Sequence, residues 1–291
     1  MTTGYTTTDA LTDSLPTVIS SARIVREDEG VMQKLVDVQY LGEGIGLSWN
    51  EVSFAQLTAQ AITETTELDN PQQLSDALLT ITPTVIGIET FISDRVYARL
   101  SPNALQQMGS LAQHAIERKK DEDGLTACDG ATTSLGGAGT TLSSGVIRAA
   151  SRRITSNATE NGPLPIHCVL HGYQIKDLED EIVGPIGSYP VPEGITARVF
   201  SDNFSGKIGN AFIFEDGNIA IDSSDDAKGG VFSKMGIVLA QGRAPRMEIK
   251  RRPEVGGGGN SIYHYDEYAY GERSSGNWLY EIYTDATAPT S

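Results

Sequence analysis

The hexapeptide IHCVLH at residues 166–171 is the clearest candidate for covalent chemistry in this sequence. Cys168 lies between His167 and His171, and a cysteine nucleophile needs an imidazole beside its thiol to accept the proton. The prolines and apolar residues around it predict a short buried strand, on which both histidines differ in parity from Cys168. This disfavours a Cys–His pair and favours a buried strand with a small apolar thiol. A cytosolic hydrolase that uses Cys168 stays open as an alternative function.

Motifs for metal and phosphate binding are incomplete. His167 and His171 would bind zinc together only on a helix, and the glutamate of the HExxH motif is absent. The glycine-rich segment LGGAGTT at 135–141 lacks the lysine of a phosphate-binding loop, so it predicts a flexible connector. The sequence therefore predicts neither a zinc site nor a nucleotide site.

Two further groups predict structure rather than chemistry. The aspartates Asp222, Asp225 and Asp226 lack the spacing and terminal glutamate of an EF-hand loop, which favours a solvated turn. A tyrosine run could stack on bases, but its acidic neighbours favour strand packing or a protein interface. Its members are Tyr263, Tyr265, Tyr268 and Tyr270. We therefore expect no catalytic residue, no metal and no cofactor, and a protein that is not an enzyme.

The composition and charge of the chain exclude several classes of function. The chain has 291 residues, 38 of them acidic and 22 basic, and the formal net charge of -16 opposes non-specific DNA binding. Two cysteines make a disulfide framework improbable and favour a reducing compartment. No apolar run approaches the roughly 20 residues of a spanning helix, and the polar N-terminus lacks the features of a signal peptide. These features predict synthesis in the cytoplasm and no membrane contact.

A long helix over residues 101–120 is the clearest element, with Ser101 as N-cap and Pro102 in its first turn. Its apolar stripe comprises Leu105, Met108, Leu111, Ala112, Ala115 and Ile116. The acidic run at 121–123 would oppose the negative end of the helix dipole, so we expect the helix to end near Lys120.

Before this helix the pattern predicts an arm and a long excursion. Residues 1–20 are polar and Thr-rich, which predicts an extended arm. Residues 31–41 predict an outgoing strand, 45–66 strand-like pieces and 78–97 a return toward the helix. A connection of this length usually acts outside its own domain.

After the helix, the pattern predicts a second helix over 143–157, a strand over 166–170 and a third helix around 173–183. Mostly strands follow from Ile195, and Asp216-Gly217 between apolar runs predicts a hairpin. The fold class is therefore α+β.

Three phrases and the C-terminal ending carry a family resemblance: ALQQMGSLAQHAIERKKDEDGL, PLPIHCVLHGYQIKDLEDEI and GNIAIDSSDDAKGGVFSKMGIVLA, with TDATAPTS. This order of phrases resembles the major capsid proteins of tailed bacteriophages with the Hong Kong 97-type fold. The resemblance implies an N-terminal arm, an extended β-hairpin loop, a peripheral domain built on a spine helix, and an axial domain. The implied boundaries are 1–35 for the arm, 36–92 for the loop, 93–162 and the return strands 245–291 for the peripheral domain, and 163–244 for the axial domain.

The resemblance also implies a function. Such proteins self-assemble as hexamers and pentamers into an icosahedral shell that encloses phage double-stranded DNA without sequence-specific binding. The expected location is the virion, and the expected partners are the chain itself, a portal protein and a separate scaffold protein. A separate scaffold, or none, is implied because only residues 1–30 precede the first expected strand. An encapsulin-like shell stays open as a close alternative.

Charge placement suggests how neighbouring subunits are held. Residues 41–80 contain acids, among them Glu64 and Glu67, and no lysine or arginine. An acidic projecting loop is most stable on a basic surface, so we expect Glu64 and Glu67 to contact Arg251 and Arg252 of a neighbour. Because the loop has no lysine, we also expect no isopeptide cross-link from it.

Overall fold

The computed structural model describes residues 5–6, 30–42, 44, 46–65, 71–99, 102–186, 206–255, 257–274 and 276–290. The helices are α1 (Met32–Leu35), α2 (Asp94–Tyr97), α3 (Pro102–Asp129), α4 (Ser144–Thr155) and α5 (Gly172–Ile186). The first strands are β1 (Tyr5–Thr6), β2 (Asp37–Tyr40), β3 (Trp49–Phe54), β4 (Asp76–Ile81), β5 (Thr84–Ser93), β6 (Ser134–Gly136) and β7 (Ile166–Leu170). The remaining strands are β8 (Lys207–Ile208), β9 (Ala211–Glu215), β10 (Asp226–Ser233), β11 (Ile237–Gln241), β12 (Arg246–Arg252), β13 (Gly259–Glu272) and β14 (Leu279–Asp285). None of the helices in the described part of the chain is long and apolar enough to span a membrane.

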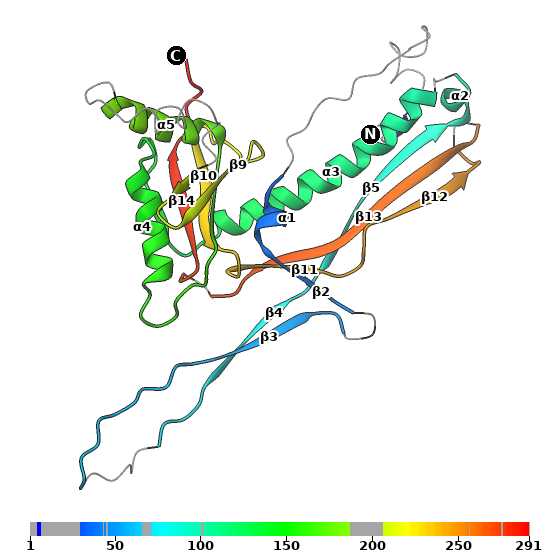
Figure 1. Cartoon of the computed structure of the whole chain (residues 1–291). Helices are drawn as coiled ribbons and strands as arrows, with labels where there is room; N and C mark the ends of the chain where they lie inside the picture. Colours follow the sequence, from blue (N-terminus) through cyan, green and yellow to red (C-terminus); the bar gives the residue numbers. More distant parts are fainter. Residues whose placement is uncertain are drawn as a thin grey trace.

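The first sheet is built around β13. Its strand order is β1-β5-β13-β11-β2, and β12 pairs with β13 beside β11. Helix α3 runs along one face of this sheet (Figure 1). The buried Asp266 and Tyr268 alternate with half-buried positions on β13, which is the period of two that lets one strand face carry α3.

The second sheet has the order β6-β14-β10-β7-β9-β8 and is covered on both faces. On one face, Cys168 and Ile213 pack with Ile147 of α4 and Leu178 of α5. On the other face, Val169 and Phe232 pack with the end of α3 and with α1. Strand β7 is buried at every position, as a strand covered on both faces must be.

A hairpin of β3 and β4 projects from the body as a separate two-stranded sheet (Figure 1). Its strands are antiparallel, with Trp49 opposite Ile81 at the base and Phe54 opposite Asp76 further out. The expected excursion is therefore present, although the outgoing segment at 31–41 is not one strand. Its first half is α1, because Met32 and Leu35, three residues apart, are both buried against α3.

Helix α3 continues nine residues past the expected end, to Asp129. The acidic run does not stop it, because Glu122 and Asp123 pair with Arg118 and Lys119 one turn earlier. Gly124 lies inside the helix rather than beyond its end. A glycine is needed at this position because a larger side chain would overlap Met32. The stripe prediction is wrong at Leu111, which is 40% exposed. The side chains at 102–109, including Leu105 and Met108, lie outside the described part.

One other expectation differs from the structure. The hairpin predicted at Asp216-Gly217 does not form, because residues 218–222 after this turn are not a strand paired with β9; Ile221 instead makes an isolated bridge to Ala227. The segment 245–291, expected in the peripheral domain, is divided between the two sheets: β14 lies in the second sheet, and β12 and β13 lie in the first. Conversely, β11 lies in the first sheet, and α4 packs on the second. Short buried runs such as β11 carry no signal for which sheet they join.

Candidate assembly surfaces and the contacts that position them

The Cys168 site does not have the geometry of a nucleophile. Its thiol is fully buried between the second sheet and α4, and burial raises the pKa of this thiol. The His167 ring is on the opposite face, 5.5 Å from the Phe214 ring, and burial lowers its pKa. His171 Nδ1 accepts the N–H of Tyr173 at 3.2 Å. In the described part of the chain neither imidazole can take the Cys168 proton.

The acidic and aromatic groups also have structural roles. Asp222 accepts the backbone N–H groups of Ser224 at 2.7 Å and Asp226 at 3.1 Å, which closes the expected turn. No group of metal-binding side chains occurs within the described ranges. Tyr263 and Tyr265 have parallel rings with 6.0 Å between centroids; Tyr263 donates its hydroxyl to Glu89 at 3.0 Å, and the Arg246 guanidinium lies 5.3 Å from the Tyr265 ring centroid.

The β3–β4 hairpin has two different faces. The face toward the body carries Trp49, Leu79 and Ile81, which pack near Val238 and Ala240. The outer face carries Val52 opposite Leu78, with exposed fractions of 49% and 64%. Four more apolar side chains of the hairpin are exposed. Their exposed fractions are 71% for Phe54, 59% for Leu57, 57% for Ile62 and 65% for Leu74. An apolar surface of this extent on a projecting element is typical of an interaction site.

Arg273 fixes the base of the hairpin to the body. Its Nε donates to Glu51 of β3 at 2.6 Å, and its Nη2 donates to Asp37 of β2 at 2.8 Å. Its Nη1 donates to the carbonyl of Met235 at 2.7 Å, and the guanidinium lies over the Trp49 ring. These contacts hold a largely buried guanidinium between β2, β3 and the end of β13, and so set the direction of the hairpin.

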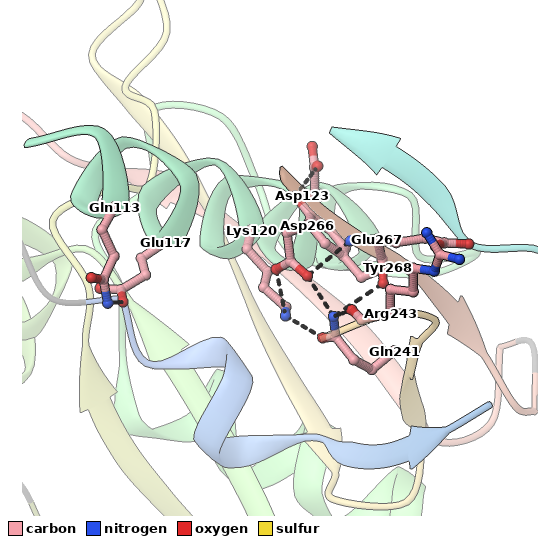
Figure 2. A network of polar contacts seen from close by, with 9 residues as sticks. All are labelled: Gln113, Glu117, Lys120, Asp123, Gln241, Arg243, Asp266, Glu267 and Tyr268. Carbon is pink, nitrogen blue, oxygen red and sulfur yellow. Dashed lines mark hydrogen bonds and ion pairs between the residues drawn. The ribbon is translucent and has the colours of Figure 1, made fainter. Parts of the chain in front are cut away.

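A buried polar network fastens α3 to the first sheet (Figure 2). Lys120 forms an ion pair with Asp266 at 3.1 Å, and both side chains are at least nine-tenths buried. Gln241 bridges the pair: its Oε1 accepts from Lys120 and its Nε2 donates to Asp266 at 2.5 Å. Tyr268 donates to Asp123 at 2.8 Å one turn further along the helix. Lys120 and Asp266 therefore compensate each other's charge in this buried network.

The four predicted contact residues are placed as follows. Arg251 forms two hydrogen bonds with Asp94 at 2.5 Å each, and Arg252 pairs with Glu89 and Glu254 at 3.1 Å. Both arginines therefore already have acidic partners within the chain. Glu64 is exposed on the hairpin, and Glu67 lies outside the described part.

Sequence reasoning missed Arg273 and the Lys120 network. Arg273 follows the longest strand and has no local partner, because Asp37 and Glu51 are more than 200 positions away. The sequence indicated Lys120 only as the expected end of the long helix, not as a buried cation. Helical spacing was the available signal, since Lys120 lies eight residues after the buried Ala112 and so shares its face.

Comparisons with solved structures identify the fold. A structure from Mycobacterium phage Che8 matches with a TM-score of 0.72 and 15% identity, over 94% of this chain and 98% of that chain. The cyanophage Pam1 capsid matches with a TM-score of 0.70 and 9% identity, over 99% and 100%. The capsid of Ralstonia phage GP4 matches with a TM-score of 0.69 and 13% identity, over 98% and 100%. No family model and no curated protein matches the sequence.

These matches define the class of fold. The chain has the mixed α+β fold of tailed-phage capsid structures over nearly its whole length, which confirms the expected α+β fold class. The neighbours come from many phages and do not favour the encapsulin alternative.

Proposed function

We propose that the protein is a major capsid protein of a tailed phage, a structural shell subunit and not an enzyme. The match to phage capsid chains over 94% to 99% of this chain supports the proposal most strongly. In this function the subunits assemble as hexamers and pentamers into an icosahedral shell around double-stranded DNA. The protein is then made in the host cytoplasm and located in the virion, with a portal protein and a separate scaffold as its further partners.

We also propose a domain assignment, which the arrangement of the two sheets supports. The first sheet with α3 corresponds to the peripheral domain, the second sheet with α4 and α5 to the axial domain, and the β3–β4 hairpin to the extended loop. The hairpin supports self-assembly, because its outer apolar face has no partner among the described residues of its own subunit. A second copy of this chain would bury that face.

Charge contributes to the same contact. We propose that Glu64 and Glu67 of the loop contact Arg251 and Arg252 of the neighbouring subunit, as the charge placement in the sequence predicts. Because both arginines already pair within the chain, this contact adds to existing ion pairs. Exposed pairs contribute about 0–1 kcal/mol each, so their effect depends on repetition around a closed shell.

Charge reversal tests this contact. Reversal of Arg251 and Arg252 to Glu should impair assembly while the subunit stays folded, and added reversal of Glu64 and Glu67 to Lys should restore part of it. A restored yield of particles supports the contact. Equal loss of assembly in both variants contradicts it.

Sizing of the purified protein tests the function itself. Sedimentation velocity should give pentamers, hexamers or particles. A small oligomer with a hydrolytic activity that Cys168→Ser abolishes would instead support the alternative hydrolase. A denaturing gel of particles should show single subunits, because covalent ladders would contradict the absence of cross-links.

A further inference from the structure

The first sheet has an edge strand, β12, that is paired on one side only. It pairs with β13 from Arg246 to Arg252, and no described strand pairs with its other side (Figure 1). Six of its seven residues are exposed. An antiparallel strand directs alternate N–H and C=O groups away from its partner. The stretch Met247–Arg251 therefore presents outward backbone groups for which no described residue is a partner.

β12 also has an uncovered apolar face beside α3. Met247 lies opposite His264 of β13, which has the same parity as Asp266, whose carboxylate contacts α3. Met247 and Ile249 therefore point to the α3 side of the sheet, yet their exposed fractions are 58% and 62%. A groove of about 420 Å³ lies between this face and α3, and Ile116 of α3 is one of its lining residues. Alternate side chains of an added strand could fill this groove.

The charges of β12 restrict what can pair with this edge. Four of its seven residues are cations and one is an acid. Charged side chains on an edge strand prevent pairing with a second copy of the same edge. The same cations favour a segment that carries acids and no cations. The edge therefore fits an acidic, extended segment with exposed apolar side chains and backbone groups that lack partners.

The outgoing branch of the hairpin, residues 55–62 beyond β3, has these properties. It is exposed at every position, and Leu57 is among its apolar side chains. The Ala55 N–H donates to the Ser75 carbonyl at 3.0 Å, and no further backbone–backbone hydrogen bond joins the described residues of the two branches. Residues 41–80 contain acids and no Lys or Arg. Extended, this branch is about 26 Å long, and β12 about 23 Å.

A second copy of the chain must supply this branch. In its own subunit the base of the hairpin packs on β11 through Trp49 and Ile81, and the hairpin projects away from β12 (Figure 1). We propose that residues 55–62 of one subunit add as a strand to the outer edge of β12 in its neighbour, with apolar side chains over the groove beside α3. The contact rests on the proposed function, because it requires subunits that assemble.

Proline at two successive positions of the branch tests this strand addition. A strand directs alternate N–H groups to its partner, and proline removes one N–H while it keeps an extended backbone. Ala59→Pro and Gln60→Pro are the matched pair, because neither residue makes a hydrogen bond within the described ranges. Unassembled subunits of both variants should therefore keep the urea midpoint of the parent.

The yield of particles, measured by sedimentation, gives the result. One of the two variants should lose at least about fivefold in yield, the effect of one lost hydrogen bond per contact, and the other should match the parent. Equal yields of the two variants, whether both normal or both low, would overturn strand addition while the parent still assembles. A parent that does not assemble would contradict the proposed function and, with it, this contact.

Hydrogen exchange of particles and of unassembled subunits tests the edge itself. Peptides that cover 55–62 and 246–252 should both exchange more slowly in particles, and about half of their amides should gain protection. Full protection of β12 in unassembled subunits would mean that the edge is covered within its own subunit. Protection of only one of the two segments in particles would mean that another segment occupies the edge. Either result would overturn the proposal.

Discussion

Lys120→Met removes the cation from the network that fastens α3 to the first sheet. Asp266 would then be a buried carboxylate without its ion-pair partner, and removal of one partner of such a pair costs about 3–5 kcal/mol. Two contacts remain for Asp266, from Gln241 at 2.5 Å and from the Glu267 N–H at 2.8 Å. We therefore expect the lower end, about 3 kcal/mol of unfolding free energy.

The double variant Lys120→Met with Asp266→Leu should recover most of this loss. Both charges are then absent, and Gln241 Nε2 still donates to the carbonyls of Arg243 at 2.9 Å and Glu267 at 3.0 Å. Replacement of a whole buried pair by apolar residues is often neutral or stabilising. The matched control is Lys119→Met, whose exposed pair with Asp123 contributes about 0–1 kcal/mol.

Urea unfolding of unassembled subunits, followed by fluorescence, measures these differences from the midpoint at constant slope. The expected order of stability is Lys119→Met above the double variant, and the double variant above Lys120→Met. The explanation would be refuted if Lys120→Met matched Lys119→Met, or if the double variant were less stable than Lys120→Met alone.

Three further outcomes are expected. Cys168→Ser should assemble like the parent, with a loss of about 1–3 kcal/mol of subunit stability from the buried hydroxyl. If the Cys168→Ser subunit folds but does not assemble, the thiol is not purely structural. Arg273→Met should leave the fold intact but increase proteolysis of the hairpin, whereas the exposed Arg148→Met should not, and equal digestion of both would contradict the anchoring function of Arg273. Phe54→Ser should change subunit stability by less than about 0.5 kcal/mol but lower the yield of particles, whereas the exposed Tyr97→Ser on α2 should not lower it.

Local patterns predicted the elements whose signals are local. The helix α4, the strand β7 and the helix α5 lie close to their expected ranges, because each has a clear apolar period and flanking turn residues. The parity argument at Cys168 was confirmed for the same reason, since a strand places its neighbours on opposite faces.

Long-range contacts decided what the sequence could not. The end of α3 depends on Met32 and Tyr270, which pack against Gly124 from distant parts of the chain. The membership of β11 and β14 in different sheets depends on pairing partners, which a buried apolar run does not specify. Asp121 belonged to the acidic run expected to end the helix, yet it is buried and accepts the N–H of Met32.

Electron microscopy of the purified, expressed protein in negative stain tests the proposed shell most directly. Closed particles of uniform diameter with icosahedral outline, or isolated pentamers and hexamers that close on concentration, are the predicted result. A uniform population of small oligomers that never forms rings or shells would contradict a capsid function for this fold.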